Sequence, residues 1–289
     1  MTILEDLKMQ YRIGGIANKL IYWNVGAFIV SLPLFFQFSQ GQFDYPVWLY
    51  LSSSVHDIMY YPWTLLTYAF LHYTFAHLFF NMLILYFSGR LFLTFFTEKQ
   101  MLGLYILSAI FSGLVFVVAY YLMDDDTGIM GASAAIMAIL MAVTTYSPLM
   151  RVRLLLIGNV KLWYITAVIL LIDLMQIKLD NTGGHIAHLA GAFFGFVYIK
   201  SLQNGTDMSK IVSGVLDFFV NLFKPKRLNP FKKVYVNHDR MNAKPVSKIV
   251  MKDKTQQQID EILDKIKESG YDSLTKQEKE FLIKAGKEI

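Results

Sequence analysis

The sequence contains no cysteine, which excludes disulfides, thiolate metal sites and cysteine nucleophiles. Charge is also scarce over the first 199 residues, which hold 9 Lys and Arg and 10 Asp and Glu, whereas residues 200–289 hold 18 and 12. A soluble domain carries roughly 25% charged residues, so 19 charges are too few to cover a soluble surface of this size. A plain soluble enzyme, a disordered chain and a disulfide-stapled secreted domain are therefore excluded.

Long apolar segments are abundant instead, because hydrophobic residues make up 55% of the chain and the mean hydropathy is +0.41. A helix that spans a bilayer needs roughly 20 largely apolar residues. Six segments qualify or nearly so, although the fourth and fifth are short: 20–38, 75–97, 101–121, 131–147, 162–178 and 185–203. The sequence predicts an all-α, polytopic membrane protein built as a bundle of six transmembrane helices.

The basic residues indicate how this bundle is oriented. Lysine and arginine are absent from residues 20–89 and 100–150, and they gather before span one and after spans two, four and six, with Lys178 as the exception. Cytoplasmic loops carry the excess of Lys and Arg, so both termini are expected in the cytoplasm. The net charge of +5 comes from the tail, where anionic lipid explains it as well as nucleic acid does, and no nucleic-acid partner is expected.

The chain divides by composition into four parts. Residues 1–19 read as a cytoplasmic N-terminus, because they lack the features of a cleaved signal peptide. Residues 20–203 form the six-helix core, and residues 204–254 form an amphipathic, basic linker containing three prolines. Residues 255–289 predict a small helical hairpin, in which Thr255 with Gln258 and Thr275 with Glu278 have the spacing of capping boxes.

Polar residues inside the spans are the candidates for function, because ionisable groups are costly in a membrane. His77 and Asn81 lie four residues apart and share one face of the second span. Ser133 opens the small-residue fourth span, and His188 lies on the sixth beside Gly191 and Gly195, whose spacing allows close helix approach. A serine hydroxyl could therefore meet an imidazole at the outer ends of two spans.

Each of these residues also has a structural interpretation. A serine in an alanine-rich span usually packs, and an intramembrane histidine is often a hydrogen-bond partner between helices. His77 and Asn81 could join helices in the same way. The only carboxylate near the histidines is Asp173, toward the outer end of span five, so neither a metal site nor a cofactor is expected.

Taken together, the motifs resemble the rhomboid family of intramembrane serine proteases. The resemblance covers about residues 20–203 and is carried by their order: Trp63, His72, His77-x-x-x-Asn81, Gly131-x-Ser133 and Ala187-His188-Leu189-Ala190-Gly191-x-x-x-Gly195. It implies that Ser133 is the nucleophile and His188 its general base. It also implies that His77, Asn81 and the Ser133 backbone N–H line an oxyanion hole.

The resemblance further implies substrates that are transmembrane segments of other proteins, and a location in a bacterial inner membrane. Gly131 stands at the family's glycine position, and Met137 stands where many members place an aromatic ring under the histidine. His185 precedes the motif and is not the family's base. The tail resembles the C-terminal extension of some bacterial rhomboids, and no oligomeric state is implied.

No carboxylate has an evident sequence position from which to orient His188, so the site is expected to work as a serine–histidine dyad. One alternative is a non-proteolytic rhomboid relative that binds transmembrane segments, but such relatives usually lack the serine or the histidine. A second alternative is a small-solute transporter. It predicts two matching halves with broken helices, and the sequence has no such internal symmetry.

Overall fold

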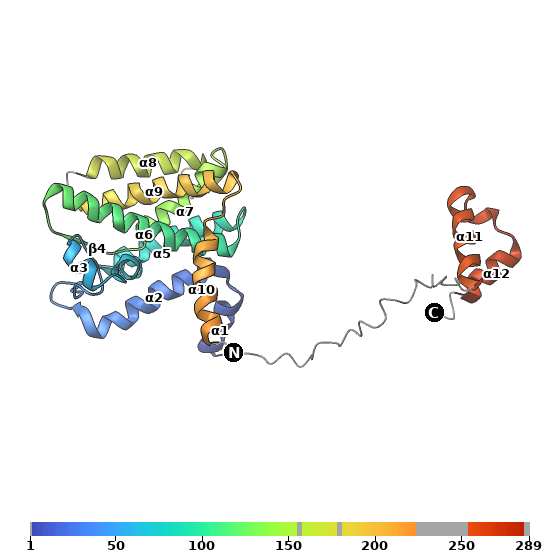
Figure 1. Cartoon of the computed structure of the whole chain (residues 1–289), viewed down its shortest axis with the longest axis horizontal. Coiled ribbons are helices and arrows are strands. Elements are labelled where there is room, and N and C mark those ends of the chain that lie inside the picture. Colours follow the sequence, from blue (N-terminus) through green and yellow to red (C-terminus); the bar gives the residue numbers. More distant parts are fainter. Residues whose placement is uncertain (1, 155–157, 178–180, 224–253, 286–289) are drawn as a thin grey trace, which may run out of the picture. The chain divides into compact units, whose positions relative to one another are not determined.

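The computed structural model describes residues 2–154, 158–177, 181–223 and 254–285. The chain forms two compact units, Met1–Pro225 and Lys226–Ile289. The first unit is mostly helical (Figure 1), as the sequence predicts. Each of the six apolar segments forms a helix: α2 (Gly15–Phe35), α5 (Phe75–Leu93), α6 (Glu98–Met123), α7 (Ser133–Tyr146), α8 (Leu162–Gln176) and α9 (Thr182–Gln203). The remaining helices of this unit are α1 (Ile3–Ile13), α3 (Val55–Tyr60), α4 (Thr64–Thr67), the 3-10 turn η1 (Tyr68–Phe70) and α10 (Ser209–Phe223).

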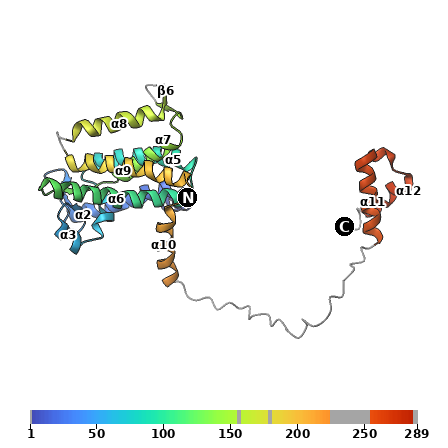
Figure 2. The same ribbon diagram turned by 45° about the horizontal axis from the view of Figure 1, so that its top comes forward.

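Helix α7 lies at the centre of the first unit. It packs against α5, α6, α8 and α9, and ten of its 14 residues are buried. Figure 2 shows α8 at the edge of the bundle, beside α9. Helices α5, α7 and α9 run in the same direction, so their N-terminal ends lie together at one end of the bundle. Ser133, His77 and His188 lie in the first or second turns of these three helices.

Two glycines allow α9 to approach α7 closely. A Cβ added at Gly191 would overlap the backbone oxygen of Ala134, and one added at Gly195 would overlap that of Ala138. The two helices are therefore in backbone contact over two turns, as the small-residue spacing predicts. This contact sets the distance between the side chains that the two helices carry.

We expect Gly195→Ala to lower the stability of the first unit by about 1–3 kcal/mol, because the added methyl group forces α9 away from α7. The measurement is the thermal unfolding midpoint of the purified protein in detergent. Gly26→Ala is the matched control, since a Cβ at that position of α2 would meet no atom within 4 Å. Equal midpoints for the two variants would contradict the close approach.

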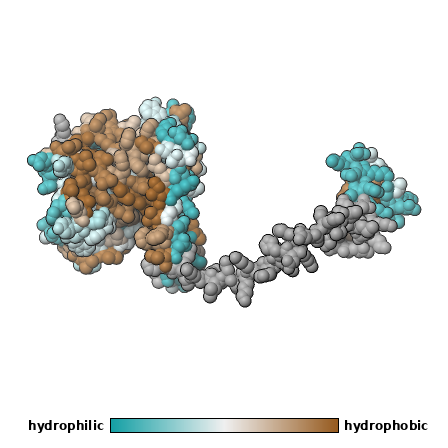
Figure 3. Space-filling model, in the orientation of Figure 1, coloured by the Kyte–Doolittle hydropathy of each residue, from teal (hydrophilic) through white to brown (hydrophobic). Residues whose placement is uncertain are grey.

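The lateral surface of the first unit is apolar. Figure 3 shows a broad hydrophobic band over the bundle, bordered at both ends by hydrophilic residues. On α8, Val168, Leu171 and Leu174 are all more than half exposed. An apolar surface of this extent is unfavourable in water and suits lipid. Within the described residues, α5 and α6 are long and apolar enough to cross a membrane, while α7 and α8 are apolar but shorter.

Short antiparallel strand pairs fix the polypeptide that leads into α7. Strand β3 (Leu51–Ser52) pairs with β4 (Gly128–Ile129), so the long segment between α2 and α5 is joined to the segment before α7. The Gly131 N–H donates to the Tyr68 carbonyl oxygen at 2.9 Å. The β3–β4 pair and the Gly131 bond therefore hold the N-terminus of α7 in place. Two further pairs complete the described strands: β1 (Phe36–Gln37) with β2 (Gln42–Phe43), and β5 (Arg151–Leu154) with β6 (Gly158–Lys161).

Helix α10 lies within the range that the sequence assigns to the amphipathic linker, and it packs against α6. A Cβ at Gly103 would come within 2.6 Å of the Ser209 Cβ, so the start of α10 contacts α6 closely. Asp207 accepts from the Ser209 N–H at 2.9 Å and from Gln100 Nε2 at 3.2 Å. Partial burial raises the pKa of the Asp207 carboxyl, but the bonds from Ser209 and Gln100 outweigh it and the pKa falls below its usual value.

The second unit contains the helices α11 (Lys254–Ser269) and α12 (Lys276–Ala285), joined by the 3-10 turn η3 (Tyr271–Ser273). The predicted box at the start of α12 is present, because Thr275 N–H donates to Glu278 Oε2 at 2.7 Å and Glu278 N–H donates to Thr275 Oγ1 at 3.4 Å. Lys265 donates to Glu278 Oε1 at 2.9 Å. This bond from Lys265, followed by those from Thr275, lowers the pKa of Glu278 to about 2. The prediction that Thr255 caps the other helix is wrong, because α11 already includes Lys254 and Thr255.

Candidate active site

Ser133 and His188 are in direct hydrogen-bond contact. Ser133 is the first residue of α7, His188 lies in the second turn of α9, and the Ser133 Oγ to His188 Nε2 distance is 2.6 Å. A nucleophilic hydroxyl needs a base within about 2.6–3.2 Å. The His188 side chain is 21% exposed, so water can reach the pair. The close approach of α7 and α9 therefore brings together a serine hydroxyl and a base.

The start of α7 also presents backbone donors. The first N–H groups of a helix have no partner within it and carry the positive end of its dipole. Ser133 is at that position, and the preceding Gly131 has φ +134°, a conformation that favours glycine. Negative charge that develops beside Ser133 Oγ would therefore meet backbone N–H groups.

His77 faces this end of α7. A Cβ added at Gly131 would come within 2.9 Å of His77 Nε2 and Cε1 and within 3.6 Å of Ser133 Oγ, so the ring edge, the glycine and the serine converge. The Tyr73 N–H donates to His77 Nδ1 at 3.4 Å, which leaves the proton of the neutral ring on Nε2. His72 is buried, and its ring packs edge-on against His77 with the centroids 5.1 Å apart.

Asn81 lies one turn beyond His77 on α5 and is buried. Its Nδ2 donates to the His77 carbonyl oxygen at 2.9 Å, which is a bond within the same helix. An amide nitrogen carries two donors, so Asn81 Nδ2 has a second N–H in addition to the one in this bond. Of the other motif residues, Met137 is buried one turn after Ser133, and Gly191 and Gly195 form the contact with α7 described above.

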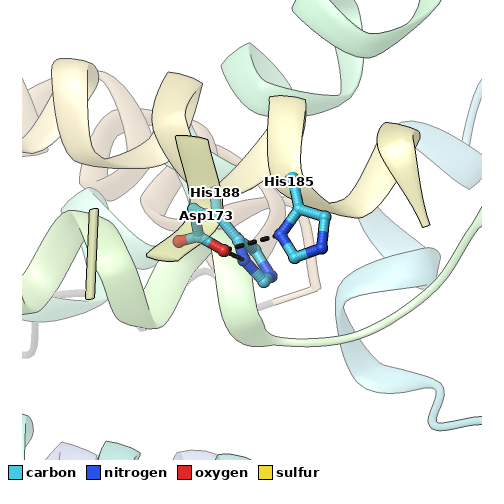
Figure 4. A group of neighbouring side chains, drawn as sticks. All are labelled: Asp173, His185 and His188. Atoms are coloured by element: carbon cyan, nitrogen blue, oxygen red, sulfur yellow. Dashed lines mark hydrogen bonds and ion pairs between the residues drawn. The ribbon is translucent and has the colours of Figure 1, made fainter. Parts of the chain in front are cut away.

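A carboxylate lies beside His188, so the expectation that none would orient this histidine is wrong. Asp173 on α8 has its Oδ1 2.9 Å from His188 Nδ1 and 2.7 Å from His185 Nδ1 (Figure 4). The sequence did not reveal this contact because Asp173 and His188 lie on different helices. One signal was present in the sequence: an acidic residue within an apolar span is costly and so points to function.

Asp173, His185 and His188 are also residue types that bind metals, and one potential ligand atom of each lies within 4.8 Å of the others. The observed distances of 2.7 and 2.9 Å are those of hydrogen bonds between ring nitrogens and a carboxylate. Tetrahedral zinc with bonds of 2.0–2.1 Å would hold its ligand atoms about 3.3 Å apart. The cluster is therefore arranged as a hydrogen-bonded group.

Comparison with known proteins gives two matches to protein families. A family model described as a Rhomboid domain matches residues 60–204, which include every candidate described above. A model for a family of unknown function, DUF6576, matches residues 250–286. No curated protein sequence matches the chain.

Proposed function

Because the chain belongs to the rhomboid family, we propose that it is an intramembrane serine endopeptidase that cleaves transmembrane segments of other proteins. The observation that carries the proposal is the 2.6 Å contact between Ser133 Oγ and His188 Nε2 at the start of a helix. A non-proteolytic relative that only binds such segments would not need this contact. The rhomboid match supports a membrane location, and the apolar band supports it independently.

In the proposed reaction, Ser133 Oγ attacks the scissile carbonyl carbon while its proton passes to His188 Nε2. The carbonyl oxygen becomes an oxyanion, which accepts hydrogen bonds from the Ser133 N–H, His77 Nε2 and Asn81 Nδ2. The carbon–nitrogen bond then breaks, and His188 returns the proton to the leaving amine. Water, deprotonated by His188, then attacks the acyl carbon, the bond to Ser133 Oγ breaks, and His188 returns the proton to Oγ as the acyl group leaves as a carboxylate. These steps need no cofactor.

The proposed topology has six transmembrane helices, α2 and α5 to α9, with both termini in the cytoplasm. Asp124 follows the last turn of α6 and Asp57 lies in α3, next to the β3–β4 pair that leads into α7, so both lie at the Ser133 end of the bundle. No Lys or Arg occurs between residues 20 and 89 or between 100 and 150. Arg90 and Lys200 lie in the last turns of α5 and α9, at the opposite end. The positive-inside rule therefore favours an outward-facing site, which in a bacterial inner membrane faces the periplasm.

One labelling experiment tests both the nucleophile and the orientation. A membrane-impermeant fluorophosphonate probe, which reacts with activated serines, is expected to label the wild type in right-side-out vesicles and to leave it unlabelled in sealed inverted vesicles. Ser133→Ala should remain unlabelled in both, because Ser133 is the one serine among the described residues that contacts His188. Labelling confined to inverted vesicles would reverse the orientation and keep the nucleophile. A wild type that stays unlabelled even in detergent would remove support for an active serine.

A further inference from the structure

The carboxylate beside His188 goes beyond the proposed dyad. Asp173 lies near the end of α8, and its side chain is only 8% exposed. Figure 4 shows the rings of His185 and His188, one turn apart on α9, both directed at the same carboxylate oxygen. Within the described residues, Asp173 Oδ2 has no hydrogen-bond partner, so Oδ1 makes both contacts.

These contacts define where the ring protons lie. An ionised carboxylate only accepts hydrogen bonds, so Nδ1 of each histidine must carry a proton in order to bond Asp173. A neutral His188 ring with its proton on Nδ1 has a free lone pair on Nε2, and Nε2 is the atom that lies 2.6 Å from Ser133 Oγ. The carboxylate thus selects the tautomer in which His188 can accept the serine proton, and it favours the imidazolium that forms next.

His185 has a different place in the cluster. Its ring contacts Asp173 rather than Ser133, and its side chain is 11% exposed. A buried carboxylate is costly unless hydrogen bonds compensate for lost hydration, and His185 supplies the second of its two bonds. His185 therefore stabilises the ionised form and the orientation of Asp173.

We propose that Asp173 is a positioning residue that holds His188 in the tautomer and orientation needed for catalysis, and that His185 holds Asp173 in place. The protease would then use a serine, a histidine and an aspartate, carried by α7, α9 and α8, and His185 would hold the aspartate in place. This inference rests on the proposed function for its kinetic consequences. Its structural content, the protonation site of His188, can be measured without any activity.

The kinetic test uses substitutions at residue 173 in the full-length protein, assayed on a transmembrane reporter. Asp173→Ala removes the acceptor, and losing a hydrogen bond to a charged group corresponds to a decrease in kcat of tenfold to roughly 10²-fold. Asp173→Asn loses the charge and adds an amide donor that can bond His188 Nδ1 and hold the opposite tautomer, so its kcat should fall at least as far as that of the alanine variant. KM should change little, because Asp173 acts through His188.

Thr166→Val is the matched control for a purely structural role. Thr166 is buried on α8, and its Oγ1 lies 2.6 Å from Thr144 Oγ1 on α7, so the substitution breaks a buried contact of α8 away from His188. It should leave kcat within about threefold of wild type, well below the cost of losing a charged hydrogen bond. Equal losses of kcat in Thr166→Val and Asp173→Ala would overturn the positioning role.

His185 offers a test by rescue. His185→Ala should lower kcat by roughly tenfold while retaining measurable activity, because Asp173 loses one of two bonds. His185→Asn places an amide N–H where Nδ1 was and should recover most of the loss. An asparagine variant as impaired as alanine would contradict the supporting role of His185.

The decisive readout is the tautomer of His188, measured from ¹⁵N NMR spectra of histidine-labelled protein at alkaline pH and assigned with His188→Ala. We expect the proton on Nδ1 in the wild type and a shift toward the Nε2 form in Asp173→Ala. A wild-type ring protonated on Nε2 would overturn the inference, as would wild-type cleavage that is lost with a chelator and restored by zinc.

If Asp173→Ala cleaves like the wild type while Ser133→Ala does not, the inference fails and the proposed function stands. If the wild type neither cleaves nor labels, the proposed function fails while the NMR measurement still decides the inference.

Discussion

Ser133→Ala and His188→Ala are each expected to abolish cleavage of a transmembrane reporter. Serine attacks a carbonyl only when a base accepts its proton, and the 2.6 Å contact is the one through which that proton would move. Loss of either member in a soluble serine protease costs on the order of 10⁶ in kcat. The double variant should be no worse than either single one, because the two groups act as a unit.

The control for Ser133→Ala is a buried serine without a base. Ser88 on α5 is fully buried, and its Oγ donates to the Ile84 carbonyl oxygen at 2.7 Å. Ser88→Ala should therefore cleave the reporter at close to the wild-type rate. For His188, the corresponding control is His72→Ala. The His72 ring packs against His77 and, within the described residues, makes no hydrogen bond, so this variant should retain measurable cleavage. Cleavage by Ser133→Ala protein, purified free of wild type, would contradict the proposed mechanism.

The helices could be predicted because a helix that spans a membrane needs a long run of apolar residues, which the sequence shows directly. Apolar length alone located all six segments that form α2 and α5 to α9, with ends displaced by a few residues. The glycine spacing on α9 also predicted a close contact, and Gly191 and Gly195 meet the backbone of α7. Both properties depend on residues near one another in the sequence, where side-chain size and hydropathy decide the outcome.

Long-range polar contacts were not predictable in the same way. The Asp173 contact depends on how α8 and α9 are rotated about their axes, which apolar α8 residues do not specify. The strand pair Leu51–Ile129 likewise joins segments far apart in the chain through backbone bonds, which leave no residue signature. The expectation that no carboxylate would orient His188 failed for this reason, since the sequence does not specify how α8 and α9 are rotated relative to each other.

His77→Ala and Asn81→Ala are expected to lower cleavage by 10²–10³-fold each without abolishing it, the range found for removing one oxyanion donor. Each substitution removes one side-chain donor, while the Ser133 N–H at the start of α7 remains. The assay is the cleavage rate of the same reporter at saturating substrate. The loss should fall on kcat, because the oxyanion exists only in the transition state and the tetrahedral intermediate.

Asn24→Ala is the control that distinguishes a role of Asn81 as an oxyanion donor from a role in helix packing. Asn24 on α2 is buried and its Nδ2 donates to the Leu20 carbonyl oxygen at 2.8 Å, the same four-residue pattern as the Asn81 bond to His77. Asn24 also donates to the Tyr105 hydroxyl at 3.3 Å, so its loss affects contact between helices more than that of Asn81 does. If packing were the function of Asn81, Asn24→Ala would impair cleavage at least as much. We expect the reverse: lower thermal stability with kcat nearly unchanged for Asn24→Ala, and lower kcat with nearly unchanged stability for Asn81→Ala.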